Sequence, residues 1–272
     1  MALQATRAIH RTAPRNAADE QAALREAPHR RIVPYLQTSC SLVLLALRAL
    51  RLTPSDRFVD LGCGDGRLAL AAAADFGAHA VGIDVAPSLL RVCRRAARAA
   101  GCDCSRGARL RYLRADLRLL YEETEEAEEA EEAEEAEEEG EAEEAVEAAG
   151  RATAVYAYLL PAVVLRLTPF LLRAIARGAR VLTLEHHLPD STDEEALSSL
   201  PPDCQRLTRF LVPVETHLFG RMRLYSSTSL GPLTHPKTED VPTVQQVLMK
   251  PLQSCMPTAR LPSCCISTKE PA

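Results

Sequence analysis

Aromatic residues are scarce in this chain of 272 residues: they make up 4% of the sequence, and tryptophan is absent. Lysine is also rare, because only Lys237, Lys250 and Lys269 stand among the 32 basic residues, and all the others are arginines. Surfaces that bind nucleic acid commonly place aromatic rings between clustered cations. The arginines here are spread along the chain without such rings, so we expect no nucleic-acid partner.

Metal-binding patterns are also missing. The nine cysteines are irregularly spaced and form no C-x-x-C pair. Cys102 and Cys104 lack the second pair, or the histidine cluster at ligand spacing, that a zinc site needs. We therefore expect no metal, and we expect free thiols in a reducing compartment.

Long hydrophobic runs are absent as well. A membrane-spanning helix needs about 18 apolar residues or more, and the longest candidate, residues 42–50, contains Arg48. We predict no transmembrane segment. Residues 1–31 carry several arginines and no acid before Asp19, which is typical of an organellar transit peptide and equally of a disordered basic terminus. The expected location is mitochondrial, with the cytoplasm as the alternative.

The net charge of −5 comes from one segment. Residues 122–147 hold 17 glutamates and no cation, and without them 20 acidic residues stand against 32 basic ones. The segment has almost no apolar side chain larger than alanine, and its closely spaced glutamates repel one another on a helix. We predict a disordered or frayed helical insertion that a short Gly/Ser link can replace without loss of folding. Its charge could attract a lysine-bearing partner or fold back on the arginine-rich body.

A glycine-rich turn is the strongest local signal in the sequence. Residues 58–67 read FVDLGCGDGR: a short apolar run, an acid, and glycines at every second position. This pattern predicts a buried strand that enters a tight turn lying against a ligand, because any Cβ there would hold the ligand away. A helix begins at Arg67, and its free N–H groups suit an anionic group. The candidate ligand-binding residues are Asp60, Gly62, Cys63, Gly64 and Gly66.

Two more acids follow predicted strands. Asp84 ends the apolar run of residues 79–85, and Asp116 ends residues 110–116. A carboxylate after the second strand can accept both hydroxyls of a ribose. One after the third strand can accept from the exocyclic amine of adenine. The carboxyl ends of parallel strands share one edge of a sheet, so the three acids predict a nucleoside site there.

The order of elements predicts an α/β fold. Strands and helices alternate up to residue 185, with predicted helices at 88–100 and 163–177. Residues 206–215 and 221–226 read as a terminal strand pair. This is the pattern of a doubly wound, Rossmann-like sheet with an antiparallel partner at one edge. The predicted domain covers residues 32–226, and residues 227–272 read as a disordered tail.

The turn distinguishes two cofactor classes. The dinucleotide fingerprint G-x-G-x-x-G places its third glycine where Arg67 stands here. The pattern D-x-G-x-G-x-G of residues 60–66 instead resembles the first motif of the class I methyltransferases that use S-adenosylmethionine (SAM). This resemblance implies a seven-stranded sheet in the order 3-2-1-4-5-7-6, with the last strand antiparallel, and SAM as cofactor.

Further motifs narrow the resemblance. Residues 33–35 (VPY), 80–84 (AVGID) and 158–161 (YLLP), together with the turn, are similar to the protein-lysine methyltransferases that modify the ATP synthase c subunit and the adenine nucleotide translocase. Prolines are usual in that family where Gln37 and Ser39 stand here. The resemblance implies a protein substrate with a target lysine, on a membrane-embedded partner. Three tyrosines are candidates to line the lysine channel or, equally, to be core aromatics: Tyr35, Tyr156 and Tyr158.

Other functions share the same core. A methyltransferase of small molecules or RNA, and a SAM-fold binding protein without catalysis, remain alternatives, with a dehydrogenase more distant. Methylases of base amino groups carry an Asn/Asp-Pro-Pro-aromatic motif after the fourth strand, where residues 160–163 read LPAV. This difference argues against base amino groups as substrates.

Overall fold

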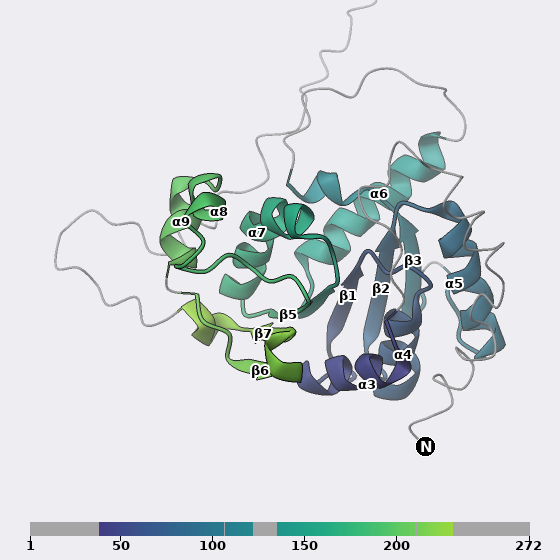
Figure 1. Ribbon diagram of the computed structural model, residues 1–272. Helices are drawn as coiled ribbons and strands as arrows, with labels where there is room; N and C mark the ends of the chain where they lie inside the picture. Colours follow the sequence, from purple (N-terminus) through teal and green to yellow (C-terminus); the bar gives the residue numbers. More distant parts are fainter. Residues whose placement is uncertain (1–37, 106, 122–134, 210, 231–272) are drawn as a thin grey trace, which may run out of the picture. The chain divides into compact units, whose positions relative to one another are not determined.

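Seven strands form one sheet within the residues that the computed structural model describes, which are 38–105, 107–121, 135–209 and 211–230. All of them lie in one compact unit, residues 1–237. The strand order is β3-β2-β1-β4-β5-β7-β6, as predicted (Figure 1). The strands are β1 (Arg57–Leu61), β2 (His79–Asp84), β3 (Leu110–Arg114), β4 (Ala154–Ala157), β5 (Arg180–Leu184), β6 (Glu215–His217) and β7 (Met222–Tyr225).

Five strands run parallel, and β7 runs antiparallel to its neighbours β5 and β6. The central strand β4 is buried along its whole length, and β1 is buried after its first residue. Near-continuous apolar runs are typical of parallel strands that are covered on both faces. The register places Asp60 of β1 beside Gly82 on one side and Tyr156 on the other. The carboxyl ends of β1, β2 and β4 therefore meet at one edge.

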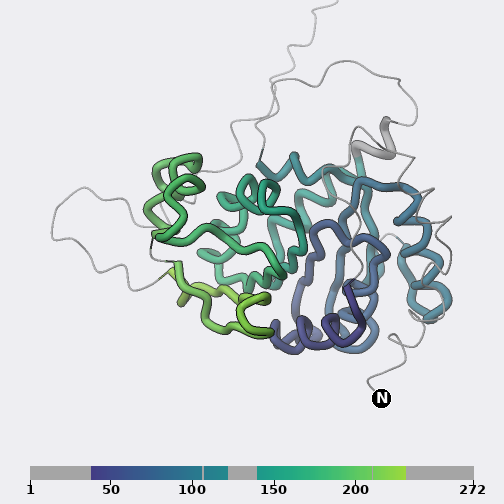
Figure 2. The backbone as a smooth tube through the Cα atoms, in the orientation of Figure 1, coloured from purple at the N-terminus to yellow at the C-terminus, as the bar shows by residue number. Residues whose placement is uncertain are grey.

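The helices connect these strands, as the tube in Figure 2 shows along the chain. Short 3-10 turns follow β3 (η1, Leu117–Leu120), β6 (η2, Leu218–Gly220) and β7 (η3, Ser227–Leu230). No described helix is both long and apolar enough to cross a membrane. The α-helices are α3 (Cys40–Ala49), α4 (Arg67–Phe76), α5 (Pro87–Ala99), α6 (Glu135–Gly150), α7 (Pro161–Ala176), α8 (Glu194–Ser198) and α9 (Pro202–Thr208).

Helices α4 and α6 cover opposite faces of the sheet. Successive residues of a strand point to opposite faces. On β3, the Tyr112 hydroxyl donates to the carbonyl of Gly66, next to α4, at 2.9 Å. Its neighbour Arg111 forms an ion pair with Glu144 of α6 at 2.6 Å. The face with α3 and α4 holds a hydrophobic cluster that includes Leu47, Leu70 and Tyr156.

Two predicted boundaries are wrong. Of the residues 206–215 that were predicted as a strand, 206–208 are the end of α9, and the strand β6 covers residues 215–217. Residues 209 and 211–214 belong to neither element, and residue 210 lies outside the described residues. Pro202 begins α9, whose buried side chains, Cys204, Leu207 and Thr208, have helical spacing. Residues 227–230, predicted as part of a disordered tail, instead form η3, which buries Ser229 and Leu230. Residues 1–37 and 231–272 lie outside the described residues, so the predictions for them stay predictions.

The acidic segment contains a helix that packs on the sheet, which corrects the prediction of a disordered or frayed helical insertion for residues 135–147. The backbone from residue 135 to 150 forms α6, which packs on β3. The alanines of α6 form its buried face, since Ala145 is 2% and Ala149 0% exposed. Glu141 accepts from the backbone N–H of Arg114 at 2.7 Å and pairs with Arg94 at 2.9 Å. Residues 122–134 lie outside the described residues.

The acids of α6 therefore fold back on the arginine-rich body, which is one of the two electrostatic roles considered for the segment. Arginines on α5 and β3 supply the cations that the segment itself lacks. A Gly/Ser link in place of residues 122–147 would remove these ion pairs and the cover over β3. We now expect such a replacement to destabilise the fold.

A milder variant tests this contribution. Glu141→Gln combined with Glu144→Gln should lower the free energy of unfolding by about 1–2 kcal/mol, because both acids pair with partly buried arginines and one also caps a backbone N–H. Glu143→Gln, at an exposed position of the same helix, is the control and should change little. Urea unfolding at low and high salt measures the loss, which should shrink as salt screens the pairs. A loss equal to that of the control would contradict a structural role for these acids.

Candidate cofactor site

The glycine-rich turn leaves β1 at the carboxyl edge of the sheet. Gly62, Gly64 and Gly66 have φ angles of 73°, 56° and 73°, a left-handed conformation that costs other residues energy. The N–H groups of Gly62 and Cys63 both donate to the carbonyl of Ile83 at 2.9 Å. The turn is thus tied to the end of β2, and α4 begins directly after it.

Two side chains that the sequence did not predict as part of the site form hydrogen bonds to carbonyl groups of the turn. The Tyr112 hydroxyl binds the Gly66 carbonyl, and the Cys93 thiol donates to the Gly64 carbonyl at 3.2 Å. A Cβ on Gly66 would lie 2.5 Å from Cε1 of Tyr112 and 2.7 Å from Sγ of Cys93. Gly66 is therefore needed for packing against the protein itself. The sequence does contain signs that both side chains are buried. Cys93 lies on the apolar face of its helix, and Tyr112 alternates with arginines along its strand.

Cys63 belongs to the turn itself, and its thiol is buried next to that of Cys93. A hydrogen bond with Cys93, then burial, raises its pKa well above the usual range. Burial raises the pKa of Cys93 as well. Both groups are therefore neutral near pH 7, which suits packing and gives no sign of a reactive thiolate. Among the described residues, no cluster of three or more metal-ligating side chains is found.

Asp84 lies beside the turn, as its position after β2 predicted. One carboxylate oxygen accepts from the N–H of Gly64 at 2.9 Å, and the other accepts from the N–H of Ala86 at 2.9 Å. The carboxylate is thus held in a fixed orientation by two backbone groups. A carboxylate oxygen can accept more than one hydrogen bond, so this fixed orientation is compatible with the predicted ribose contact, which stays a prediction.

Asp116 is held differently. It caps η1 by accepting from the N–H of Arg118 at 2.9 Å, and it forms an ion pair with the guanidinium of Arg118 at 2.7 Å. An adenine amine would have to share this carboxylate with Arg118. The adenine contact of Asp116 stays a prediction.

Asp60 is the most unusual acid of the site. It is 2% exposed, and its Oδ2 has no hydrogen-bond partner among the described residues. Burial, followed by the nearby carboxylates of Asp65 and Asp84, raises its pKa well above the usual range. A buried carboxylate without a partner is costly. A cationic group placed against it would lower that cost.

Arg67 occupies the position where a dinucleotide fingerprint has its third glycine, and the structure shows why an arginine stands there. Its guanidinium forms a buried ion pair with Asp65, with Nε 2.9 Å from Oδ1. It also donates to the carbonyl of Thr38 at 2.6 Å. The side chains of Arg67 and Asp65 are only 6% and 5% exposed. This contact joins the segment before α3 to the glycine-rich turn, and sequence reasoning missed it.

The three predicted tyrosines fall in different places. Tyr156 is 1% exposed within the hydrophobic cluster, and burial raises the pKa of its phenol. Tyr158 is half-buried just beyond β4. Tyr35 lies outside the described residues. The segment after β4 does reach the turn, because a Cβ on Gly62 would lie 2.8 Å from Cδ2 of Leu159. A role of these tyrosines in a substrate channel stays a prediction.

Comparison with known proteins supports the assignment of the class. Residues 58–130, which begin in β1 and include the turn, Asp84 and Asp116, match a protein family described as a methyltransferase domain. No curated protein sequence matches the chain.

Several solved structures are similar to this chain. An RNA methyltransferase from Salinibacter ruber, in complex with S-adenosyl-L-homocysteine, is 24% identical over 76% of this chain and 100% of its own, with a TM-score of 0.47. TrmN from Thermus thermophilus is 23% identical over 60% and 41%, with a TM-score of 0.37. A SAM-dependent methyltransferase from Thiobacillus denitrificans, also with S-adenosyl-L-homocysteine, is 18% identical over 62% and 54%, with a TM-score of 0.39.

The chain thus spans the whole of the first of these structures and about half of the other two. The matched family and the strand order 3-2-1-4-5-7-6 together support a SAM-dependent methyltransferase of class I.

Proposed function

We propose that this protein transfers a methyl group from SAM to a lysine of a protein substrate. The main observation in favour of this cofactor is the buried carboxylate of Asp60 at the base of the glycine-rich turn, whose Oδ2 has no hydrogen-bond partner among the described residues. SAM bears an ammonium group and a sulfonium centre, so it offers the positive charge that this acid lacks. The match of residues 58–130 to methyltransferase domains supports the same cofactor.

Each part of the site would hold a different part of SAM. The turn from Gly62 to Gly66, with the first N–H groups of α4, would face the methionine carboxylate. Asp60 would attract the ammonium group, and Asp84 would accept from the ribose hydroxyls. Asp116 would accept from the adenine amine. When bound, SAM supplies an electrophilic methyl group on sulfur.

The chain's own residues would then position a lysine amine in line with that methyl group and keep water out, because proximity supplies much of the rate of such a displacement. The segment Tyr158–Pro161 lies next to the turn through Leu159, and we expect it to form part of the entrance for the lysine. An apolar, half-buried entrance lowers the pKa of a lysine by desolvation, so that the amine arrives neutral.

The lysine substrate is supported by the motifs shared with the protein-lysine methyltransferases of membrane-embedded, mostly helical proteins. We propose a partner of that kind and a mitochondrial location. Purified protein with labelled SAM should therefore label a protein of a mitochondrial or bacterial-type membrane fraction, with mass spectrometry locating the methyl group on lysine. Label found only in RNA, or only in small metabolites, would overturn the lysine assignment and leave the methyltransferase in place.

Asp84→Ala supplies the matched test of the cofactor site. A ribose without its acceptor should lower the affinity for SAM by about 1–3 kcal/mol, or roughly 5- to 150-fold. Calorimetry on the folded variant measures this change. Asp103→Ala, which alters an exposed acid in the loop before β3, is the control and should bind SAM normally. Unchanged affinity in Asp84→Ala would show that this acid does not hold the cofactor.

A further inference from the structure

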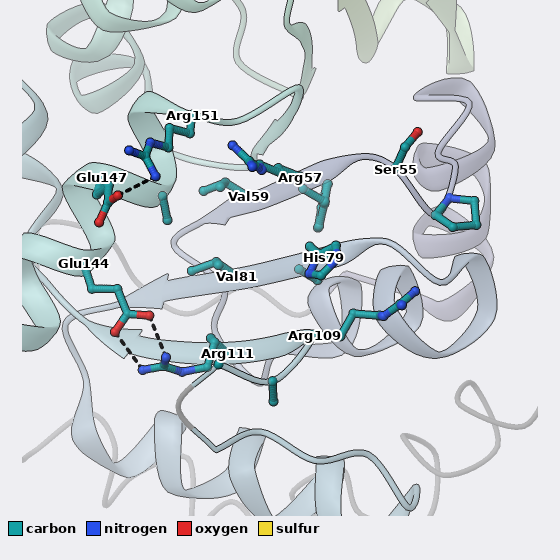
Figure 3. A pocket seen from close by; sticks show the side chains of 16 residues that line it. Ser55, Arg57, Val59, His79, Val81, Arg109, Arg111, Glu144, Glu147 and Arg151 are labelled. Carbon is teal, nitrogen blue, oxygen red and sulfur yellow. Dashed lines mark hydrogen bonds and ion pairs between the residues drawn. The ribbon is translucent and has the colours of Figure 1, made fainter.

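A second hollow lies between α6 and the beginnings of β1, β2 and β3, with a volume of about 520 Å³ (Figure 3). Its floor is formed by Val59 and Val81, which are direct partners in the register of β1 and β2. It opens toward the amino ends of these strands, whereas the glycine-rich turn follows the carboxyl end of β1. The hollow is therefore separate from the candidate cofactor site.

The composition of α6 explains why space remains here. The helix presents Ala148 to the hollow instead of a large apolar side chain. Two ion pairs flank the space: Glu144 with Arg111 at 2.6 Å, and Glu147 with Arg151 at 2.7 Å. The glutamates thus neutralise two of the four arginines around the hollow and hold the helix over it.

The other basic side chains around the hollow form a row across three neighbouring strands. Arg57 and His79 are register partners at the start of β1 and β2. Arg109 precedes β3, and its carbonyl accepts from the N–H of Ala80, which places it next in the row. Arg57 forms no ion pair with the described residues, and Arg109 donates only to the carbonyl of Gly77. Arg57 and Arg109 are therefore two cations at the rim without acidic partners among the described residues.

We propose that this hollow binds a nucleotide-sized ligand that carries a phosphate group. The side chains of Arg57 and Arg109 point away from each other in Figure 3, and Arg109 donates to the carbonyl of Gly77, so both would turn toward the phosphate when it binds. An arginine can give a phosphate two parallel hydrogen bonds. The ring of the ligand would lie on Val59 and Val81, beneath Ala148. A volume of about 520 Å³ lies within the range of roughly 300–1,000 Å³ that is usual for small-molecule sites.

A small phosphate ligand fits better than a nucleic-acid strand. A strand held by its backbone needs an extended cationic track. Here the cations stand at the rim of a single hollow, and the floor is apolar. Arg151, which lies beside Arg57 in Figure 3, is already paired with Glu147.

The experiment measures binding of uridine monophosphate and of pyrophosphate to the whole chain by calorimetry at low ionic strength. Both should bind saturably. Arg57→Ala combined with Arg109→Ala should weaken both by at least about tenfold, since the main phosphate contacts are removed. Arg95→Ala, at an exposed position of α5, is the control and should leave both affinities unchanged.

A second variant separates the ring from the phosphate. Ala148→Phe should fill the hollow, so that uridine monophosphate is lost while pyrophosphate still binds at the rim. Circular dichroism confirms that each variant is folded. Asp84→Ala shows which of the two places binds the ligand. The variant should leave binding in the hollow unchanged, whereas it should weaken binding at the cofactor site.

Three results would overturn the proposal. One is the absence of saturable binding to the unaltered protein. Another is binding that survives the double arginine variant or is lost in Asp84→Ala. The third is salt-dependent binding of an oligonucleotide without binding of the two small ligands, which would indicate a nucleic-acid surface. None of these results depends on whether the protein methylates lysine.

Discussion

Arg67→Ala is expected to lower the free energy of unfolding by about 3–5 kcal/mol, which is the usual effect of removing one partner of a buried ion pair. Asp65 would remain as a buried charge, with its own side chain 5% exposed. The carbonyl of Thr38 would lose its donor as well. Urea or thermal unfolding measures the loss. Arg95→Ala, an exposed arginine on α5, should change the stability by about 0.5 kcal/mol or less.

A double-mutant cycle separates the ion pair from the other effects of Arg67. Asp65→Asn combined with Arg67→Met removes both charges, so it should be less destabilising than the sum of the two single variants. Additive losses would show that the two side chains do not stabilise each other. In that case the loss in Arg67→Ala would reflect packing and the contact with Thr38 alone.

Asp60→Asn is expected to stabilise the protein without cofactor near pH 7, by about 1–3 kcal/mol. The folded state raises the pKa of Asp60 above the usual value of 3.8, so the folded protein binds this proton more tightly than the unfolded chain. Stability from this group is complete below about pH 3.8 and is lost as the pH rises toward the folded pKa. Asparagine cannot ionise, so its gain should be absent at acidic pH and grow toward neutral pH.

The same variant should bind SAM roughly 10- to 100-fold more weakly, because asparagine cannot attract the ammonium group. Unfolding curves across the pH range and calorimetry with SAM measure the two effects. Glu143→Gln on α6 is the control and should show neither. Stability that falls in Asp60→Asn would mean that the carboxylate has a stabilising partner. Unchanged SAM affinity would remove Asp60 from the cofactor site.

The turn and its acids could be predicted from the sequence because their constraints are local. The D-x-G-x-G-x-G pattern requires backbone conformations that few residues other than glycine adopt readily, and Gly62, Gly64 and Gly66 adopt them. Asp84 follows the next strand along the chain, and parallel pairing alone brings it beside Gly64. The alternation of strands and helices likewise predicted the sheet, and the resemblance supplied its order.

The supports of the site could not be predicted, because they join residues far apart in the sequence. Cys93 and Tyr112 reach the glycine-rich turn from α5 and β3. Arg67 reaches back to Thr38. In the sequence each of these side chains has several possible partners, and only the packing of α4 and α5 against the sheet selects one.

The acidic segment shows the same division most clearly. Its composition alone determined that it carries a dense negative charge and almost no large apolar side chain. Whether residues 135–150 form a helix depended on the arginines of α5 and β3, which lie far away in the sequence and which only the folded sheet brings within reach of Glu141 and Glu144. The repulsion between closely spaced glutamates was therefore outweighed by tertiary ion pairs and by the burial of Ala145 and Ala149, because a helix gains most of its stability from the surface it packs against.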